Sequence, residues 1–110
     1  MKESEIEKIL VQNVRHVGGR AYKFVSPGND GVPDRLVLLP YGRIVFTELK
    51  TETGKLSDLQ RMQLKRIRAL GQEAIVIRGI DGVSQFFQDY GYPDIAKKLR
   101  AKYGGDDERV

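Results

Sequence analysis

Three charged side chains are spaced so that, with a metal ion, they could hydrolyse a phosphodiester bond. Glu48 and Lys50 are two residues apart, at the end of an apolar run that begins at Arg43. The run is rich in β-branched and aromatic residues and predicts a strand, on which residues two apart point to the same face. A carboxylate and an amine would then lie side by side, and buried charge is costly unless it is paired or binds a metal. Asp34, fourteen residues before Glu48, supplies a second carboxylate.

The two carboxylates predict a hard divalent cation as cofactor. Asp34 follows Pro33 where a loop enters a strand, and Glu48 lies near the end of the next strand, so both could reach one ion across a hairpin. Oxygen ligands suit Mg²⁺ or Mn²⁺, and the absence of Cys excludes thiolate sites. Such an ion would polarise a phosphoryl oxygen and lower the pKa of a bound water. Lys50 could orient that water, stabilise developing negative charge, or act as a base if burial lowers its pKa.

Two predicted helices flank these strands and could add polar groups to the site. Glu7 could supply a third carboxylate, and Gln60 could donate to a phosphate or to a metal-bound water. Alternatively, Glu7 completes a capping box with Ser4, and the third carboxylate comes from Glu3 or Glu5 nearby. Gln60 could also be an ordinary surface residue of its helix. The residues expected to contact the backbone of a nucleic acid are Lys23, Ser26, Arg35, Lys55, Arg61 and Lys65.

Length and composition limit the classes of protein that this chain can be. Its 110 residues predict one domain, over 1–103, followed by a polar tail over 104–110. The 40% apolar and 31% charged residues are typical of a globular protein, and the net charge of +4 favours a polyanionic partner. No apolar run approaches the roughly 20 residues of a membrane span, and the N-terminus lacks the form of a signal peptide. We therefore expect a cytoplasmic protein without a membrane partner.

The hydrophobic pattern predicts alternating helices and strands. The expected elements are a helix over 4–17, strands over 21–25, 35–39 and 43–50, a helix over 56–70, a strand over 74–78, and helical segments over 82–90 and 93–103. The buried face of the second helix is expected to contain Leu56, Leu59, Ile67 and Leu70. The fourth strand is apolar enough to be central, and a right-handed crossover would place it parallel to the third. The fold class is α/β, a mixed β-sheet flanked by helices in the order α-β-β-β-α-β-α.

These residues resemble the PD-(D/E)XK nuclease superfamily, and its VRR-NUC branch most closely. The resemblance spans about residues 5–80, and its motifs are Gly31-Val32-Pro33-Asp34-Arg35, Glu48-Leu49-Lys50 and Gln60. It implies a restriction-endonuclease-like core and Mg²⁺- or Mn²⁺-dependent cleavage of DNA. It also implies Asp34, Glu48 and the backbone carbonyl of Leu49 as metal ligands and Lys50 as the catalytic lysine. It suggests Glu7 as a further acidic ligand and Gln60 as the glutamine of the site.

The same resemblance suggests a substrate. Small stand-alone members of the branch, found in phages and prophages, are similar to Holliday-junction resolvases, which work as homodimers on branched DNA. We therefore expect a homodimeric endonuclease selective for four-way junctions, in a bacterial or phage-infected cell. The alternatives are a nuclease of ordinary duplex DNA, a non-catalytic DNA-binding subunit, and a metal-free structural domain. In the last case Glu48 and Lys50 would be a surface pair and Asp34 a turn residue.

Overall fold

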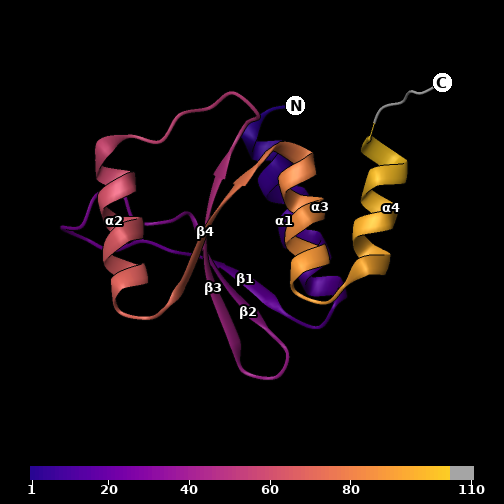
Figure 1. Ribbon diagram of the computed structural model, residues 1–110, viewed down its shortest axis with the longest axis horizontal. Coiled ribbons are helices and arrows are strands. Elements are labelled where there is room, and N and C mark those ends of the chain that lie inside the picture. The colour runs from indigo at the N-terminus through magenta and orange to yellow at the C-terminus, as the bar shows by residue number, and fades with distance from the viewer. Residues whose placement is uncertain (105–110) are drawn as a thin grey trace.

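In the computed structural model, which describes residues 1–104, a four-stranded mixed sheet carries helices on both faces (Figure 1). The elements are α1 (Glu3–His16), β1 (Arg20–Lys23), β2 (Arg35–Leu39), β3 (Arg43–Lys50), α2 (Asp58–Ala69), β4 (Glu73–Arg78), α3 (Gly79–Asp89) and α4 (Pro93–Tyr103). Strands β1 to β3 form an antiparallel meander, and β4 pairs parallel with β3. The predicted restriction-endonuclease-like fold and the β3-α2-β4 crossover are confirmed. The helical segments predicted over 82–90 and 93–103 are α3 and α4, which the predicted order of elements counted as one. The predicted tail lies outside the described residues apart from Gly104.

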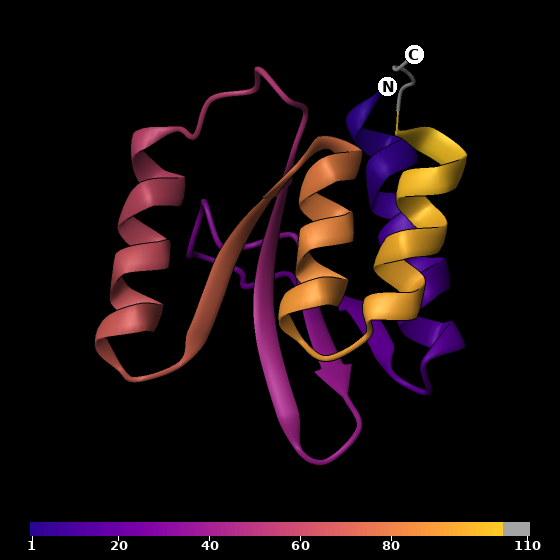
Figure 2. The same cartoon turned by 45° about the vertical axis from the view of Figure 1, so that its right-hand side comes forward.

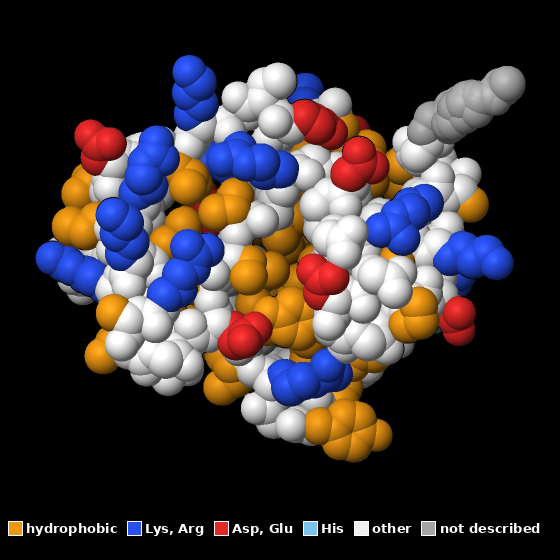
Figure 3. All heavy atoms as spheres, viewed as in Figure 1, with side chains coloured by type: hydrophobic (Ala, Val, Ile, Leu, Met, Phe, Trp, Pro, Cys, Tyr) orange, Lys and Arg blue, Asp and Glu red, His pale blue; other side chains and the backbone are white. Residues whose placement is uncertain are grey.

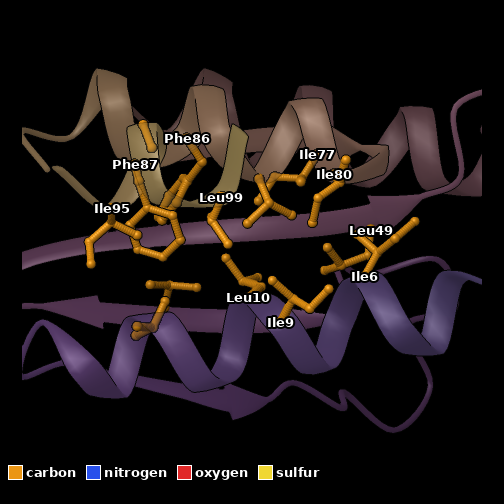
Figure 4. Close-up of a cluster of buried hydrophobic side chains, with 14 of the residues drawn as sticks. Ile6, Ile9, Leu10, Leu49, Ile77, Ile80, Phe86, Phe87, Ile95 and Leu99 are labelled. Carbon is orange, nitrogen blue, oxygen red and sulfur yellow. The ribbon is translucent and has the colours of Figure 1, made fainter. Parts of the chain in front are cut away.

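The layers of the molecule decide which strand residues are buried. Helices α1, α3 and α4 lie on one face of the sheet, and α2 lies on the other (Figures 1 and 2). The main core fills the space between the sheet and the three helices (Figure 4). Val45 and Leu49 of β3 are fully buried in this core. Since side chains alternate along a strand, Glu48 and Lys50 point to the opposite face, towards α2.

The start of α1 differs from the prediction. The helix begins at Glu3 rather than Ser4, and Lys2 is its N-cap residue. The backbone N–H of Lys2 donates to Oε1 of Glu5 at 2.9 Å, so Glu5 has the position that the sequence suggested for Glu7. The predicted capping box of Ser4 and Glu7 is therefore wrong. The helix gains its first turn earlier because Glu5 can reach back to the amide that precedes the helix.

The packing of α2 and β4 corrects two other predictions. β4 is an edge strand of the sheet formed by the described residues, not a central one. It is apolar because α2 covers one of its faces and α3 the other. Since α2 packs mainly on this one strand, its contact face is narrow. Leu59 and Leu70 are 48% and 78% exposed, and the buried residues are Gln63 and Leu64. None of the helices in the described part of the chain could span a membrane.

Candidate active site

The two predicted carboxylates face each other across the central strands. The register pairs Arg35 of β2 with Thr47 of β3, which puts Asp34 opposite Glu48 one residue further along. Oδ2 of Asp34 accepts a hydrogen bond from the backbone N–H of Leu49 at 2.8 Å. The backbone N–H of Phe24 donates to the carbonyl oxygen of Asp34 at 3.0 Å. Asp34 is thus held where the loop from β1 enters β2. β1 ends at Lys23, and not at Val25 as predicted.

Glu48 is a buried acid whose environment opposes its ionisation. Its side chain is 2% exposed. Burial, and next the neighbouring Asp34 carboxylate, raise the pKa of Glu48 from its ordinary 4.5 to about 7. The Lys50 ammonium opposes this shift, because its Nζ lies 3.7 Å from Oε2 of Glu48. A cation beside the two carboxylates would remove their mutual repulsion.

Gln60 joins this pair from the first turn of α2. Its Nε2 donates to Oε2 of Glu48 at 3.0 Å. The same side chain takes part in the N-terminal cap of the helix, because its Oε1 accepts from the backbone N–H of Ser57 at 2.9 Å. Oγ of Ser57 in turn accepts from the backbone N–H of Gln60 at 3.1 Å. The structure thus brings Asp34, Glu48, Lys50 and Gln60 together at one end of the sheet.

Glu7 is not brought to this cluster. Its Oε2 accepts from Nε of Arg35 at 2.6 Å, as an ion pair in which both side chains are about one-fifth exposed. Arg35 also donates to the carbonyl oxygen of Ala21. The acid of α1 whose charge acts on the site is Glu3, which contributes to the raised pKa of Glu48. The first turn of α1, the end of β3 and the start of α2 lie at the same end of the molecule (top in Figures 1 and 2).

The sequence assigned no packing role to two residues that hold α2 against the site. Gly31 has φ +86°, and a Cβ atom there would lie 2.7 Å from the carbonyl carbon of Leu59 and 2.9 Å from the backbone N of Gln60. Nε2 of Gln63 donates to the carbonyl oxygen of Asp30 at 3.3 Å. The loop before β2 therefore docks directly on the first turns of α2. A glycine ahead of Val-Pro-Asp was the available cue for this close approach.

The basic residues expected to bind nucleic acid divide into two groups. Lys55, Arg61 and Lys65 are exposed, and Lys and Arg side chains gather over α2 and the loop before it (left in Figure 3). Lys23 is exposed at the end of β1. In contrast, Arg35 is engaged with Glu7, and Oγ of Ser26 accepts from Nδ2 of Asn29 at 2.9 Å. An exposed basic surface therefore begins beside the carboxylates and continues along α2.

The oxygen donors of the cluster fit a hard cation that keeps part of its water shell. Among the described residues, no three His, Cys, Asp or Glu side chains come together as a complete metal cage. Mg²⁺ is commonly bound through one or two carboxylates, with water and substrate phosphate as the other ligands. Asp34 and Glu48 supply that number. A groove of about 750 Å³ along β4 and α3 contains none of the four cluster residues.

Comparison with known proteins identifies the family. No family model matches the chain. A protein named "Putative nuclease p44", from Acyrthosiphon pisum secondary endosymbiont phage 1, is 51% identical over 81 residues, which are 74% of this chain and 87% of that protein. A solved structure described as a VRR_NUC domain superposes with a TM-score of 0.76 at 30% identity, over 80% of this chain and 96% of the other. The chain belongs to the VRR-NUC family.

Two more distant structures share the fold of this VRR-NUC chain. A VRR_NUC domain protein has a TM-score of 0.63 at 19% identity, over 83% of this chain and 88% of its own. Hjc, described as a Holliday junction resolvase from Archaeoglobus fulgidus, has a TM-score of 0.52 at 22% identity, over 69% of this chain and 67% of its own. The VRR-NUC branch implied by the motifs Gly31–Arg35, Glu48–Lys50 and Gln60 is confirmed as the family by the structure at 30% identity.

Proposed function

We propose that this chain is a divalent-metal-dependent endonuclease that hydrolyses phosphodiester bonds in DNA. That it is a nuclease follows from its family. Metal dependence and the site residues rest on one observation, the two facing carboxylates of Asp34 and Glu48 with the Lys50 ammonium beside them. Carboxylates that repel each other in a buried position are a favourable site for a hard cation.

Each side chain of the cluster then has a role in the reaction. Asp34, Glu48 and the backbone carbonyl of Leu49 would hold Mg²⁺ or Mn²⁺, which supplies Lewis-acid activation of the phosphate and of a water molecule. Lys50 places positive charge where negative charge develops on the phosphoryl group. Gln60 fixes the orientation of the Glu48 carboxylate through its amide. Glu48, once its charge is balanced, stays ionised at neutral pH.

A third acid from α1 is proposed to be Glu3 rather than Glu7. Glu7 is paired with Arg35 at 2.6 Å, and releasing it would leave the half-buried guanidinium without its partner. Glu3 is exposed in the first turn of α1, and its charge already acts on Glu48. Glu3 is therefore free to approach a metal ion or its water shell. Replacing Glu3 should weaken cleavage more than replacing Glu5, which reaches back to Lys2.

The DNA substrate is proposed to be branched, with a four-way junction as the preferred form and a homodimer as the active species. The Hjc structure supports this choice, since it shares the fold and is described as a Holliday junction resolvase. Its identity of 22% leaves the substrate preference to be tested on this chain itself. A nuclease of ordinary duplex DNA is the other outcome that the test must distinguish.

One experiment tests the site and the substrate together. Linear, flapped and four-way DNA are incubated with the protein and Mg²⁺, Mn²⁺ or EDTA, beside a Lys50→Ala variant whose melting temperature is checked. We expect cleavage of the four-way DNA with either metal and a loss of about 10²–10³-fold in Lys50→Ala. Cleavage in EDTA, or unchanged cleavage by Lys50→Ala, would contradict the proposed site. Equal cleavage of all three substrates would leave a nuclease without junction preference.

A further inference from the structure

A side chain of the N-terminal cap of α2, Gln60, is hydrogen-bonded directly to Glu48, a proposed metal ligand. The Gln60 side chain bridges two groups that lie on different elements. Its Oε1 accepts from the backbone N–H of Ser57, and its Nε2 donates to Oε2 of Glu48. A capping box normally satisfies only the free N–H groups at the start of its own helix. Here the second hydrogen bond of the amide leaves the helix and reaches β3.

The orientation of this amide is fixed by the chemistry of its two neighbours. The backbone N–H of Ser57 can only donate, so it requires the amide oxygen. The Glu48 carboxylate, when ionised, can only accept, so it requires the amide nitrogen. A flipped amide would lose both hydrogen bonds at once. The cap therefore determines which group of Gln60 faces the carboxylate.

The same hydrogen bond decides which oxygen of Glu48 is occupied. Gln60 Nε2 at 3.0 Å and Lys50 Nζ at 3.7 Å both approach Oε2. In the described part of the chain, no N–H donor and no cation reaches Oε1. Gln60 and Lys50 thus both engage one oxygen of the carboxylate, Oε2, and leave Oε1 without an N–H donor or cation among the described residues.

Ser57 is joined to Gln60, and not to Glu48, by both of its hydrogen bonds that involve a side chain, so it can act on the carboxylate only through Gln60. Its Oγ accepts from the backbone N–H of Gln60 at 3.1 Å, which fixes the first turn of α2 around the amide. Gly31 also limits this turn, because a Cβ there would lie 2.9 Å from the backbone N of Gln60. The backbone of Gln60 thus meets both the Ser57 hydroxyl and the loop that leads into Asp34.

We propose that Ser57 is a positioning residue of the active site, which acts through Gln60 on the orientation of the Glu48 carboxylate. The inference rests on the proposed metal-dependent function. It predicts that the cap of α2 contributes to metal affinity, in addition to its ordinary contribution to helix stability. Residues that orient metal ligands typically change metal affinity by 10–100-fold when they are replaced.

The test measures Mn²⁺ affinity by calorimetry and melting temperature in parallel on the full-length protein. We expect Ser57→Ala to weaken Mn²⁺ binding by about 3–10-fold, and Ser57→Thr, which keeps the hydroxyl, to restore it to within about two-fold. The matched control is Ala69→Gly, which loosens the opposite, exposed end of the same helix. It should lower the melting temperature while leaving Mn²⁺ affinity unchanged.

A double-mutant cycle shows whether Ser57 acts through Gln60. In a Gln60→Ala background, adding Ser57→Ala should still lower the melting temperature but should change Mn²⁺ affinity by less than about 1.5-fold. Independent, multiplying effects on affinity would overturn the inference, as would wild-type affinity in Ser57→Ala. Both results presuppose a wild-type protein that binds Mn²⁺ and cuts DNA. A wild type that does neither would instead contradict the proposed function. Should the double variant fail to fold, the Ser57→Thr and Ala69→Gly comparison decides alone.

Discussion

At the scale of single residues, Glu48 combines burial with a neighbouring like charge. A carboxylate that is 2% exposed would ordinarily be neutral or fully paired. Glu48 has Lys50 at 3.7 Å and the amide of Gln60 at 3.0 Å, but Asp34 lies opposite. Burial and the Asp34 carboxylate outweigh the Lys50 ammonium and raise the pKa of Glu48 to about 7. Without a metal ion, the ionised form of this residue therefore opposes folding.

This balance predicts a pH-dependent effect of Glu48→Gln on stability. The folded-state pKa of about 7 is above the ordinary 4.5, so the favourable contribution of Glu48 is complete below pH 4.5 and is lost as the pH rises through 7. Glutamine is neutral throughout. In EDTA, we expect Glu48→Gln to be more stable than wild type at pH 8, by roughly 1–3 kcal/mol, and close to wild type at pH 5. Thermal melts at the two pH values measure the difference.

A control variant and added metal make this result specific. Asp30→Asn removes an exposed loop carboxylate, and it should show no comparable gain at pH 8. Adding Mg²⁺ or Mn²⁺ at pH 8 should raise the melting temperature of wild type and leave that of Glu48→Gln nearly unchanged, because the variant lacks a ligand charge. A variant less stable than wild type at pH 8 in EDTA would show that the partners of Glu48 outweigh its burial.

At the scale of elements, local pattern predicted most of the secondary structure, and packing decided the rest. The positions of β2 and β3 could be predicted from the β-branched and aromatic run from Arg43 to Lys50 and from the glycines and prolines around it. Strand and turn preferences depend mainly on neighbouring residues in the sequence. The prediction that Leu59 and Leu70 are buried is wrong, because the number of helix residues that become buried depends on how much of the sheet the helix covers. α2 meets mainly β4, an edge strand. Exposure of these leucines could not be read from their spacing.

The candidate site shows the same division. Asp34, Glu48 and Lys50 could be predicted because their positions follow from strand alternation and one hairpin. Glu7 could not be placed, because its partner is Arg35, 28 residues away on β2. The pairing depends on the side on which α1 packs, and an acid at the edge of a helical stripe carries no sign of it. The role of Gly31 could not be predicted either, because it depends on the contact between the loop before β2 and α2.

The exposed face of α2 gives a prediction for DNA binding. Arg61 and Lys65 are one turn apart and exposed, and each can neutralise one phosphate. Replacing both with Ala should weaken binding of duplex and four-way DNA alike and reduce the slope of log K against log salt by about 2. Fluorescence anisotropy across a salt series in EDTA measures both quantities without cleavage.

The matched control is the pair Lys97 and Lys98 on α4, which are also exposed and lie in a different layer. An equal effect of the two pairs would indicate non-specific attraction by net charge rather than a path along α2.

At the scale of the whole molecule, the described part of the chain contains one cluster of proposed catalytic residues. Asp34, Glu48, Lys50 and Gln60 meet at one end of the sheet, so under the proposed function one protomer would cut one strand at a time. Resolving a four-way junction requires two cuts related by the symmetry of the DNA. A homodimer with a two-fold axis would present two such clusters in matching orientations. Its mass in solution should be twice the 12.5 kDa of the chain.

Mixed dimers of wild type and Lys50→Ala give a sharper test of this arrangement than mass alone. Co-refolding equal amounts should give about one quarter wild-type dimers, one half mixed dimers and one quarter inactive dimers. Paired cuts, scored as linear product from a cruciform plasmid, should therefore fall to about one quarter per total protein. Single nicks, which need one intact site, should persist and accumulate from the mixed dimers. A monomeric nuclease would instead keep about half of its activity for every product, because inactive chains would only dilute active ones. Linear product that falls only to one half would contradict the dimer while leaving the nuclease site intact.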